Sequence, residues 1–182
     1  MKGYDNMGTI LKYIDCNGII IDTETGLFDE YHRLKKINRS LTKKEYLERI
    51  DWDEWIKNAP IVDNAIKKLK SHNQSDTIIL TKVSSLDEGV VKVDYLRNLG
   101  VRNTIGLVPY VLRKSQIAYA KGNILFDNSI DNLEYWYEYG GIPIYYSDEE
   151  HELFPTTTSL EDVLSGKILD SPKVKQLQKK RQ

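Results

Sequence analysis

The chain has 182 residues, of which 40% are hydrophobic, so it can bury one core and falls within the usual size of a single domain. Its 26 basic and 27 acidic side chains give a formal net charge of -1, which excludes the global positive field of a nucleic-acid-binding protein. The single cysteine, Cys16, has no partner for a disulfide within the chain, and the three histidines lack zinc-ligand spacing. We therefore expect a small polar ligand, with neither nucleic acid nor zinc as a partner.

The chain also lacks the patterns of a membrane or exported protein. Its longest apolar runs are too short to span a bilayer, and its N-terminus does not show the basic-then-apolar order of a signal peptide. An unpaired cysteine suits a reducing compartment. The sequence therefore predicts a soluble, cytoplasmic protein without a membrane partner.

Short apolar runs alternate with segments of helical period along most of the chain. The first is a strand over Thr9 to Ile14 that stops at Asp15. The elements expected after it are a helix over Ile61 to Lys70 following Pro60, a strand over Thr77 to Thr81, a helix over Val90 to Leu99 closed by Gly100, a strand over Thr104 to Val108, a strand over Gly122 to Phe126 ending at Asp127, a helix over Asn132 to Tyr139, and a strand over Ile142 to Tyr146. This alternation predicts the α/β class, a doubly wound parallel sheet covered on both faces.

One segment interrupts the alternation. Residues 24–59 contain no convincing strand, and they read as a small helical cap insert with an N-cap signal over Ser40 to Glu45. The core domain is then expected to comprise residues 1–23 and 60–170, with Ser159 capping a helix near its end. Residues 171–182 form a basic tail, which we interpret as a frayed, solvated end.

Polar side chains follow several of the predicted strands. In open α/β sheets, ligands bind beyond the carboxyl ends of the strands. The residues expected there are Asp15, Thr81, Lys114, Asp127 and Asp131. A carboxylate nucleophile, a hydroxyl and an ammonium for a phosphoryl group, and further carboxylates for a hard cation make up a phosphoryl-transfer set.

These segments resemble the motifs of the haloacid dehalogenase (HAD) superfamily. They stand here as Asp15-Cys16-Asn17-Gly18 with Asp22 after an apolar run, as Ile78 to Thr81, and as Ile124 to Asp131. The match covers roughly residues 9–146, and its order and spacing are fairly specific. The resemblance implies a HAD-like Rossmannoid fold and a magnesium-dependent phosphatase.

Within that superfamily, the stretch from Val108 onward is similar to small bacterial and phage phosphatases related to cytosolic 5'(3')-deoxyribonucleotidases. The similarity implies a nucleoside monophosphate or another small phosphate ester as substrate. The implied roles are Asp15 as the nucleophile that forms an aspartyl-phosphate, Thr81 and Lys114 as phosphate ligands, the turn at Cys16 and Gly18 as a source of backbone donors, and Mg²⁺ held by Asp15, the carbonyl of Asn17, Asp127 and Asp131. Lys121 is the rival for the role of Lys114.

The first motif departs from the family pattern at Asn17, where phosphatases of this superfamily carry the Asp that protonates the leaving oxygen and later activates water. An amide cannot exchange a proton in this way, and general acid–base catalysis is typically worth about 100-fold to 10,000-fold. Three explanations remain open: an engineered substitution that traps ligand, a naturally impaired or binding-only member, or a reaction whose leaving group needs no acid. Asn128, where many relatives have a second Asp, favours natural divergence.

Several residues also have simpler interpretations. Asp131 is at the right place to cap the following helix, and Cys16 lacks the Arg and His of a cysteine phosphatase. In the insert, Phe28 and Tyr31 are candidates for contact with substrate, although packing within the insert is the more common role for such aromatics. Two functions from different classes therefore stand: a slow phosphohydrolase, and an impaired nucleotide-, phosphate- or partner-binding module. A receiver-like signalling domain is disfavoured. Its acceptor Asp normally follows a strand in the middle of the chain, whereas Asp15 follows the first strand.

Overall fold

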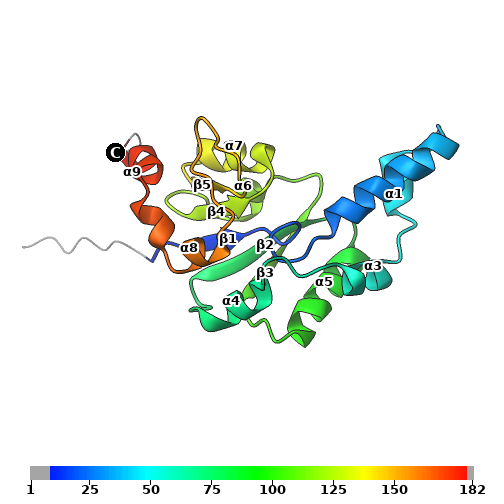
Figure 1. Ribbon diagram of the computed structural model, residues 1–182, viewed down its shortest axis with the longest axis horizontal. Coiled ribbons are helices and arrows are strands. Elements are labelled where there is room, and N and C mark those ends of the chain that lie inside the picture. The colour runs from blue at the N-terminus through cyan, green and yellow to red at the C-terminus, as the bar shows by residue number, and fades with distance from the viewer. Residues whose placement is uncertain (1–8, 180–182) are drawn as a thin grey trace, which may run out of the picture.

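The computed structural model describes residues 9–179, which form a parallel sheet between two layers of helices (Figure 1). The strands are β1 (Lys12–Ile14), β2 (Thr77–Val83), β3 (Thr104–Pro109), β4 (Ile124–Asp127) and β5 (Ile142–Tyr145). Their order across the sheet is β3-β2-β1-β4-β5, and each adjacent pair is parallel. The predicted doubly wound α/β class is confirmed, and β1 occupies the centre of the sheet.

The helices cover both faces of this sheet. They are α1 (Glu24–Ile37), α2 (Lys43–Leu47), α3 (Trp52–Asn58), α4 (Ala65–Ser71), α5 (Leu86–Asn98), α6 (Lys114–Ile117), α7 (Ile130–Glu138), α8 (Leu160–Leu164), the 3-10 helix η1 (Lys167–Asp170) and α9 (Pro172–Lys179). Successive strand residues point to opposite faces, so Ile14 joins the core cluster that includes α4, α5 and α8, while Tyr13 packs with Trp136 of α7. Both strand faces are buried, which explains the continuous apolar runs in the sequence.

The insert consists of α1, α2 and α3, and α1 projects away from the sheet (Figure 1). Thr42 and Glu45 form a capping box at the start of α2, within the segment that carried the N-cap signal. The indole Nε1 of Trp55 in α3 donates to the carbonyl of Thr23 at 3.0 Å. This bond ties the end of the insert to the turn from which the insert departs.

The helix expected over Ile61 to Lys70 begins later, at Ala65. Asp63 and Asn64 have positive φ values of 40° and 55°, which an α-helix does not accommodate. Instead of starting a helix, Ile61 bridges to Ile21, and the Val62 amide donates to the Ile20 carbonyl. Pro60 therefore does not occupy a first helical turn, because this segment closes the base of the insert.

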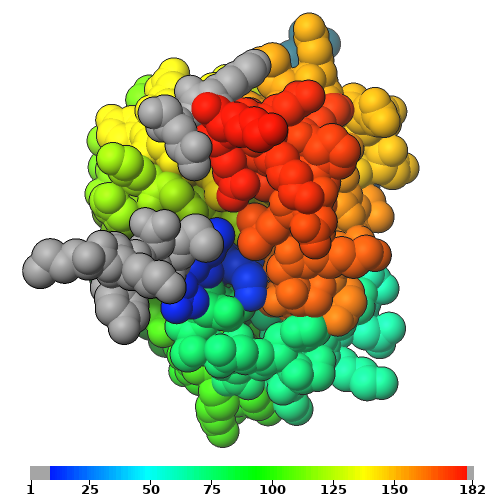
Figure 2. Space-filling model, turned by 90° about the vertical axis from the view of Figure 1, so that its left-hand side faces the viewer, coloured from blue at the N-terminus to red at the C-terminus, as the bar shows by residue number. Residues whose placement is uncertain are grey.

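The interpretation of residues 171–182 as a frayed end is wrong for the described part, Pro172–Lys179, which forms α9. Val174 is fully buried and Leu177 is nearly so. Figure 2 shows this helix, in red, lying on the orange segment that contains α8 and η1. Val174 and Leu177 are three residues apart, which is the spacing of one helical face. The charged residues around them led to the prediction of a solvated end. Residues 180–182 lie outside the described residues.

The other expected elements are present with shifted ends. Helix α7 begins at Ile130 with Ser129 as N-cap, so Asp131 lies in its first turn and does not cap it. Ser159 does cap α8, since its hydroxyl accepts from the Asp162 amide at 3.1 Å. Within residues 9–179, no helix combines the length and the apolar character needed to cross a membrane.

The burial of Val174 predicts that α9 contributes to stability. Val174→Ala should lower the free energy of unfolding by about 2 kcal/mol, because buried methyl groups are lost and a cavity remains. Gln176→Ala, at an exposed position of the same helix, should change it by less than about 0.5 kcal/mol. Urea unfolding followed by circular dichroism measures both variants, and equal, small effects would show that the helix does not pack on the core in solution.

Candidate active site

Two carboxylates meet at the carboxyl edge of the central strands. Asp15 follows the last residue of β1, and Asp127 is the last residue of β4. The strands are neighbours in which Ile14 pairs with Phe126, and the Asp15 amide donates to the Phe126 carbonyl at 2.9 Å. This register brings the two acids side by side, although 112 positions of sequence separate them.

Lys114 lies between these carboxylates. Its Nζ is 2.5 Å from Asp15 Oδ1 and 2.6 Å from Asp127 Oδ2, and its side chain is 1% exposed. Burial by itself would lower the pKa of Lys114, but Asp127 and Asp15 more than offset this effect and raise the pKa above its usual value. Lys121, the rival in the sequence, is exposed at the surface. The ammonium that faces Asp15 is therefore that of Lys114.

Asp127 has further partners. Its Oδ1 accepts from the Ser129 amide at 2.9 Å, and its Oδ2 also accepts from Asn132 Nδ2 at 3.0 Å. Burial nonetheless raises the pKa of Asp127 to about 6, with the charge of Asp15 acting in the same direction against Lys114. The sequence did not single out Asn132 as a site residue. Its position one turn after the Asp127 loop was the feature that could have indicated it.

The turn after β1 is held by backbone hydrogen bonds. The Cys16 carbonyl accepts from the amides of Ile20 and Ile21, and Gly18 has a φ of 73°. A Cβ at Gly18 would come within 2.5 Å of the Asn128 side chain, so this position requires glycine. Cys16 is fully buried, and burial raises the pKa of its thiol to about 12, which keeps it protonated and inert.

The side chain of Asn17 is fixed by the turn that leads into the insert. The Thr23 hydroxyl donates to Asn17 Oδ1 at 3.1 Å, and Thr23 is in turn held by Trp55. Because Oδ1 accepts this bond, the amide Nδ2 of Asn17 is the group left for a ligand. Asn17 can donate a hydrogen bond in the cleft but cannot supply a proton.

A cleft of about 320 Å³ opens over these residues, between the sheet edge and the insert. Five residues predicted from the sequence line it: Asp15, Asn17, Phe28, Asp127 and Asp131. The lining residues that the sequence did not single out include Glu24, Lys43, Lys82, Ser84, Glu88 and Tyr110. Lys43 Nζ lies 4.4 Å from the centroid of the Phe28 ring, so the insert contributes both an aromatic surface and a cation.

Other predicted residues lie outside the cleft lining. Thr81 is fully buried within β2, which continues to Val83, and its hydroxyl donates to the Lys82 carbonyl at 3.3 Å. Tyr31 is buried in the insert, where its ring packs against Tyr46. Of the two insert aromatics considered, only Phe28 therefore reaches the cleft.

A buried ion pair supports the loop after β2. Glu88 and Lys92 of α5 are paired, and Lys92 Nζ also donates to the Lys82 carbonyl at 3.2 Å. Glu88 accepts from the amide and the hydroxyl of Ser84, each at 2.6 Å. The pair fixes the backbone on both sides of Val83, where polar groups face the cleft. Its i, i+4 spacing was visible in the sequence, but its burial was not.

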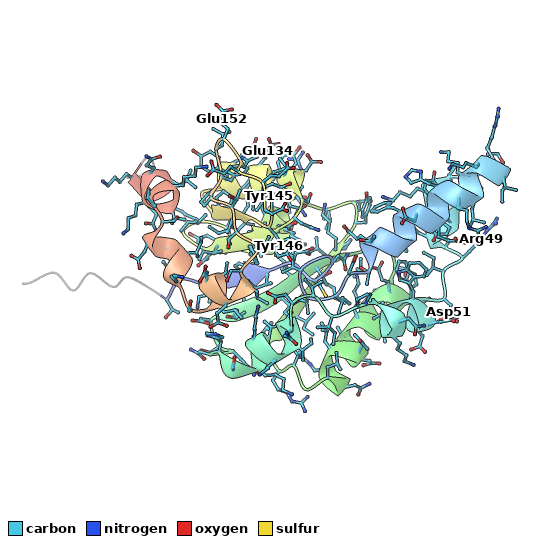
Figure 3. The ribbon with its side chains drawn as sticks, in the orientation of Figure 1. Arg49, Asp51, Glu134, Tyr145, Tyr146 and Glu152 are labelled. Atoms are coloured by element: carbon cyan, nitrogen blue, oxygen red, sulfur yellow. The ribbon has the colours of Figure 1, made fainter. Side chains whose placement is uncertain are left out.

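A larger cavity of about 870 Å³ lies within the insert, away from Asp15. Its lining is largely apolar and includes Leu34, Ile50 and Trp55, together with Arg49 and Asp51, which lie at the insert end of the molecule in Figure 3. It contains none of the strand-end residues. The smaller cleft, which contains paired carboxylates and lysines, is therefore the better candidate for chemistry.

The donor set of the cleft suits a hard divalent cation. Asp15, Asp127 and the backbone carbonyl of Asn17 all offer oxygen, and no group within residues 9–179 hydrogen-bonds to Asp15 Oδ2. In the same range, no group of three or more His, Cys, Asp and Glu side chains could hold a metal ion. Mg²⁺ does not require such a group, since it commonly uses one or two carboxylates and completes its shell with water and phosphate.

No protein-family model and no curated protein sequence matches this chain. Solved structures do match: a HAD-superfamily hydrolase, subfamily IA, variant 1, from Geobacter sulfurreducens superposes with a TM-score of 0.58 at 12% identity, over 90% of this chain and 99% of that one. The chain has the haloacid dehalogenase fold. A HAD-superfamily hydrolase from Ehrlichia chaffeensis gives a TM-score of 0.50 at 13% identity (92% and 96% covered), and a haloacid dehalogenase-like family hydrolase from Xanthomonas campestris gives 0.51 at 14% (95% and 97% covered).

The HAD fold is thus established by shape at low sequence identity. The descriptions of these three structures name hydrolases without a substrate, so the similarity to nucleotidases remains a prediction from the sequence. The HAD-like arrangement accounts for the helical insert directly after β1.

The ion cluster predicts a specific loss of stability. Lys114→Met leaves two buried carboxylates uncompensated and should lower the free energy of unfolding by about 3–5 kcal/mol at neutral pH. The loss should shrink as the pH falls toward 4, because Asp127, whose pKa is already raised, binds a proton and its charge disappears. Urea unfolding at pH 7 and pH 4.5 measures both effects.

The matched control is Lys121→Met, which should change stability by less than about 0.5 kcal/mol. Asp127→Asn in the Lys114→Met background should recover part of the loss, because it removes one of the two unpaired charges. A similar, small effect of both lysine substitutions would contradict the ion cluster.

Proposed function

We propose that this protein is a magnesium-dependent phosphomonoesterase that acts on a small phosphate ester. The observation that supports this most strongly is the pair of strand-end carboxylates, Asp15 and Asp127, held around the single ammonium of Lys114. One nucleophilic carboxylate, one cation and oxygen ligands for a divalent ion are the components that phosphoryl transfer requires. The HAD fold of the chain is consistent with this chemistry.

In this proposal Asp15 attacks phosphorus. One oxygen of the Asp15 carboxylate bonds to phosphorus, and the phosphoryl group is transferred to it to form an aspartyl-phosphate. Lys114 orients Asp15 and offsets the repulsion between the carboxylate and the phosphate dianion. Because the hydroxyl of Thr81 is buried in β2 and Ser84 already donates to Glu88, the side chain of Lys82, which lines the cleft, is better placed to bind phosphate oxygens.

Magnesium would be held by Asp15, Asp127 and the carbonyl of Asn17, with Asp131 at the rim of the cleft. When bound, it supplies positive charge that stabilises the phosphoryl group in the transition state. Lys114 already neutralises one of the two negative charges on Asp15 and Asp127. One divalent cation then leaves the site positive enough to accept a phosphate dianion.

The insert would contact the organic part of the substrate. Phe28 and Tyr110 both line the cleft, and Lys43 Nζ is 4.4 Å from the first ring centroid and 5.8 Å from the second. Aromatic surfaces of this kind suit a planar group such as a nucleobase. A nucleoside monophosphate is therefore the substrate that combines the sequence resemblance with the lining of the cleft.

The proposal requires that phosphate release depend on Mg²⁺ and on Asp15. The chain should release phosphate from thymidine 5'-monophosphate only with Mg²⁺, and Asn17→Asp should keep or raise this rate, because the new carboxyl can also transfer a proton. Asp15→Asn is the matched negative control. Phosphate release across a panel of nucleotides and sugar phosphates measures the rates, and an Asn17→Asp variant no faster than Asp15→Asn would refute the phosphatase proposal.

Phe28 should contact the organic part of the substrate. Phe28→Ala should raise KM for the same nucleotide by about ten-fold, the equivalent of about 1.4 kcal/mol of lost stacking, with little change in kcat. Tyr31→Phe should leave KM unchanged, since Tyr31 is buried outside the cleft. If the two variants behave alike, the insert does not contact the substrate through Phe28.

A further inference from the structure

The cleft contains one carboxylate whose environment differs from that of all the others lining it. Asp15 and Asp127 are bonded to Lys114, and Glu88 is bonded to Lys92 and Ser84. Asp131 is exposed at the rim, in the first turn of α7. Five acids thus line the cleft, and four of them are either paired or open to solvent.

Glu24 is the fifth acid. Its side chain is half-buried in the cleft, and no group within residues 9–179 forms a hydrogen bond or ion pair with its carboxylate. Partial burial removes some of the water that solvates a carboxylate and so disfavours its charged form. Its place in the first turn of α1 suits an acid, because the positive end of the helix dipole stabilises a carboxylate there, but no side chain within the described residues binds it in the cleft.

The backbone of Glu24 is fixed close to Asn17. Glu24 is the first residue of α1 and directly follows Thr23, whose hydroxyl donates to Asn17 Oδ1 at 3.1 Å. Thr23 is itself buried, and its carbonyl accepts from Trp55 Nε1. The residue that lacks an exchangeable proton and the unpaired carboxyl are thus attached to the same hydrogen-bonded turn.

The surroundings of Glu24 raise the pKa of its carboxyl. Burial raises the pKa of Glu24, and the carboxylates of Asp15 and Asp127 raise it further, while Lys92 and Lys43 act in the opposite direction. The net effect raises the pKa above that of an ordinary glutamate. The dianion of a bound phosphate ester adds negative charge to the same cleft and acts in the same sense as the two aspartates.

We propose that Glu24 is a catalytic residue that supplies the proton transfer that Asn17 cannot perform. The inference rests on the proposed phosphatase function and deepens it. It replaces the expectation of a slow enzyme without a general acid with that of an enzyme whose acid comes from the first residue of the insert. Asn17 keeps the role of a hydrogen-bond donor through Nδ2.

The two half-reactions balance with this assignment. As the bond between phosphorus and the ester oxygen breaks, Asp15 bonds to phosphorus and Glu24 gives its proton to the departing oxygen, which leaves as the alcohol. The Glu24 carboxylate then takes a proton from the water that attacks phosphorus. Phosphate is released, Asp15 is regenerated as a carboxylate, and Glu24 is protonated again.

Leaving-group dependence tests the assignment. Thymidine 5'-monophosphate has an alkoxide leaving group that needs a proton, whereas 4-nitrophenyl phosphate has a stable phenolate leaving group that does not. Glu24→Gln should slow release from the nucleotide by about 100-fold or more and release from the aryl ester by less than about ten-fold. It should also remove the fall in kcat/KM at high pH that follows loss of the Glu24 proton. Glu30→Gln, on the same helix in an exposed ion pair, should change neither rate.

A second carboxyl should rescue the variant. Asn17→Asp in the Glu24→Gln background should restore release from the nucleotide, and the gain should be at least ten-fold larger than the gain from Asn17→Asp alone. This comparison separates loss of a proton donor from loss of folding, because a misfolded Glu24→Gln protein would not recover.

The outcomes distinguish the two proposals. If the wild type hydrolyses the aryl ester in an Asp15-dependent manner, and Glu24→Gln slows both esters equally or neither, the phosphatase proposal stands and Glu24 is not the acid. The same holds if the wild type hydrolyses only the aryl ester. If the wild type hydrolyses neither, both proposals fail.

Discussion

The ammonium of Lys114 between Asp15 and Asp127 is the interaction on which the site depends. Two carboxylates buried at adjacent strand ends repel each other, and in a region of low dielectric one of them would otherwise take up a proton. The lysine offsets this repulsion, with its Nζ 2.5 Å and 2.6 Å from them. The turn after β1, the loop after β4 and the start of α6 therefore have to meet at one point.

Around this cluster, the insert completes the cleft. The turn from Asn17 to Glu24 leads out of the sheet edge, and the bond between Trp55 and Thr23 returns the end of the insert to the same turn. The insert thus leaves and re-enters the core beside the carboxylates, so that Phe28 and Lys43 face them. A residue change in the first motif, Asn17, can then be offset by a residue of the insert without moving the strands.

Similarity of shape at 12–14% identity has a physical explanation. A buried parallel sheet requires apolar, mostly β-branched strands and right-handed crossovers, and many sequences satisfy these conditions. The fold therefore fixes where strand ends meet, while the chemistry depends on a few side chains at that edge. For this chain, those side chains depart from the pattern of the superfamily at Asn17, which is why the fold alone does not establish an activity.

The sequence by itself determined the strands, the helical insert and the position of Asp15 and Asp127, because hydrophobic period and strand-end position are local properties. Only the tertiary structure decided between Lys114 and Lys121, buried the hydroxyl of Thr81, and packed Val174 on the core. It also set Glu24, an ordinary acid in the sequence, into a cleft where no side chain of residues 9–179 pairs with it. The physical reason is common to all four: burial and pairing depend on residues far apart in the chain, and neither composition nor periodicity carries that information.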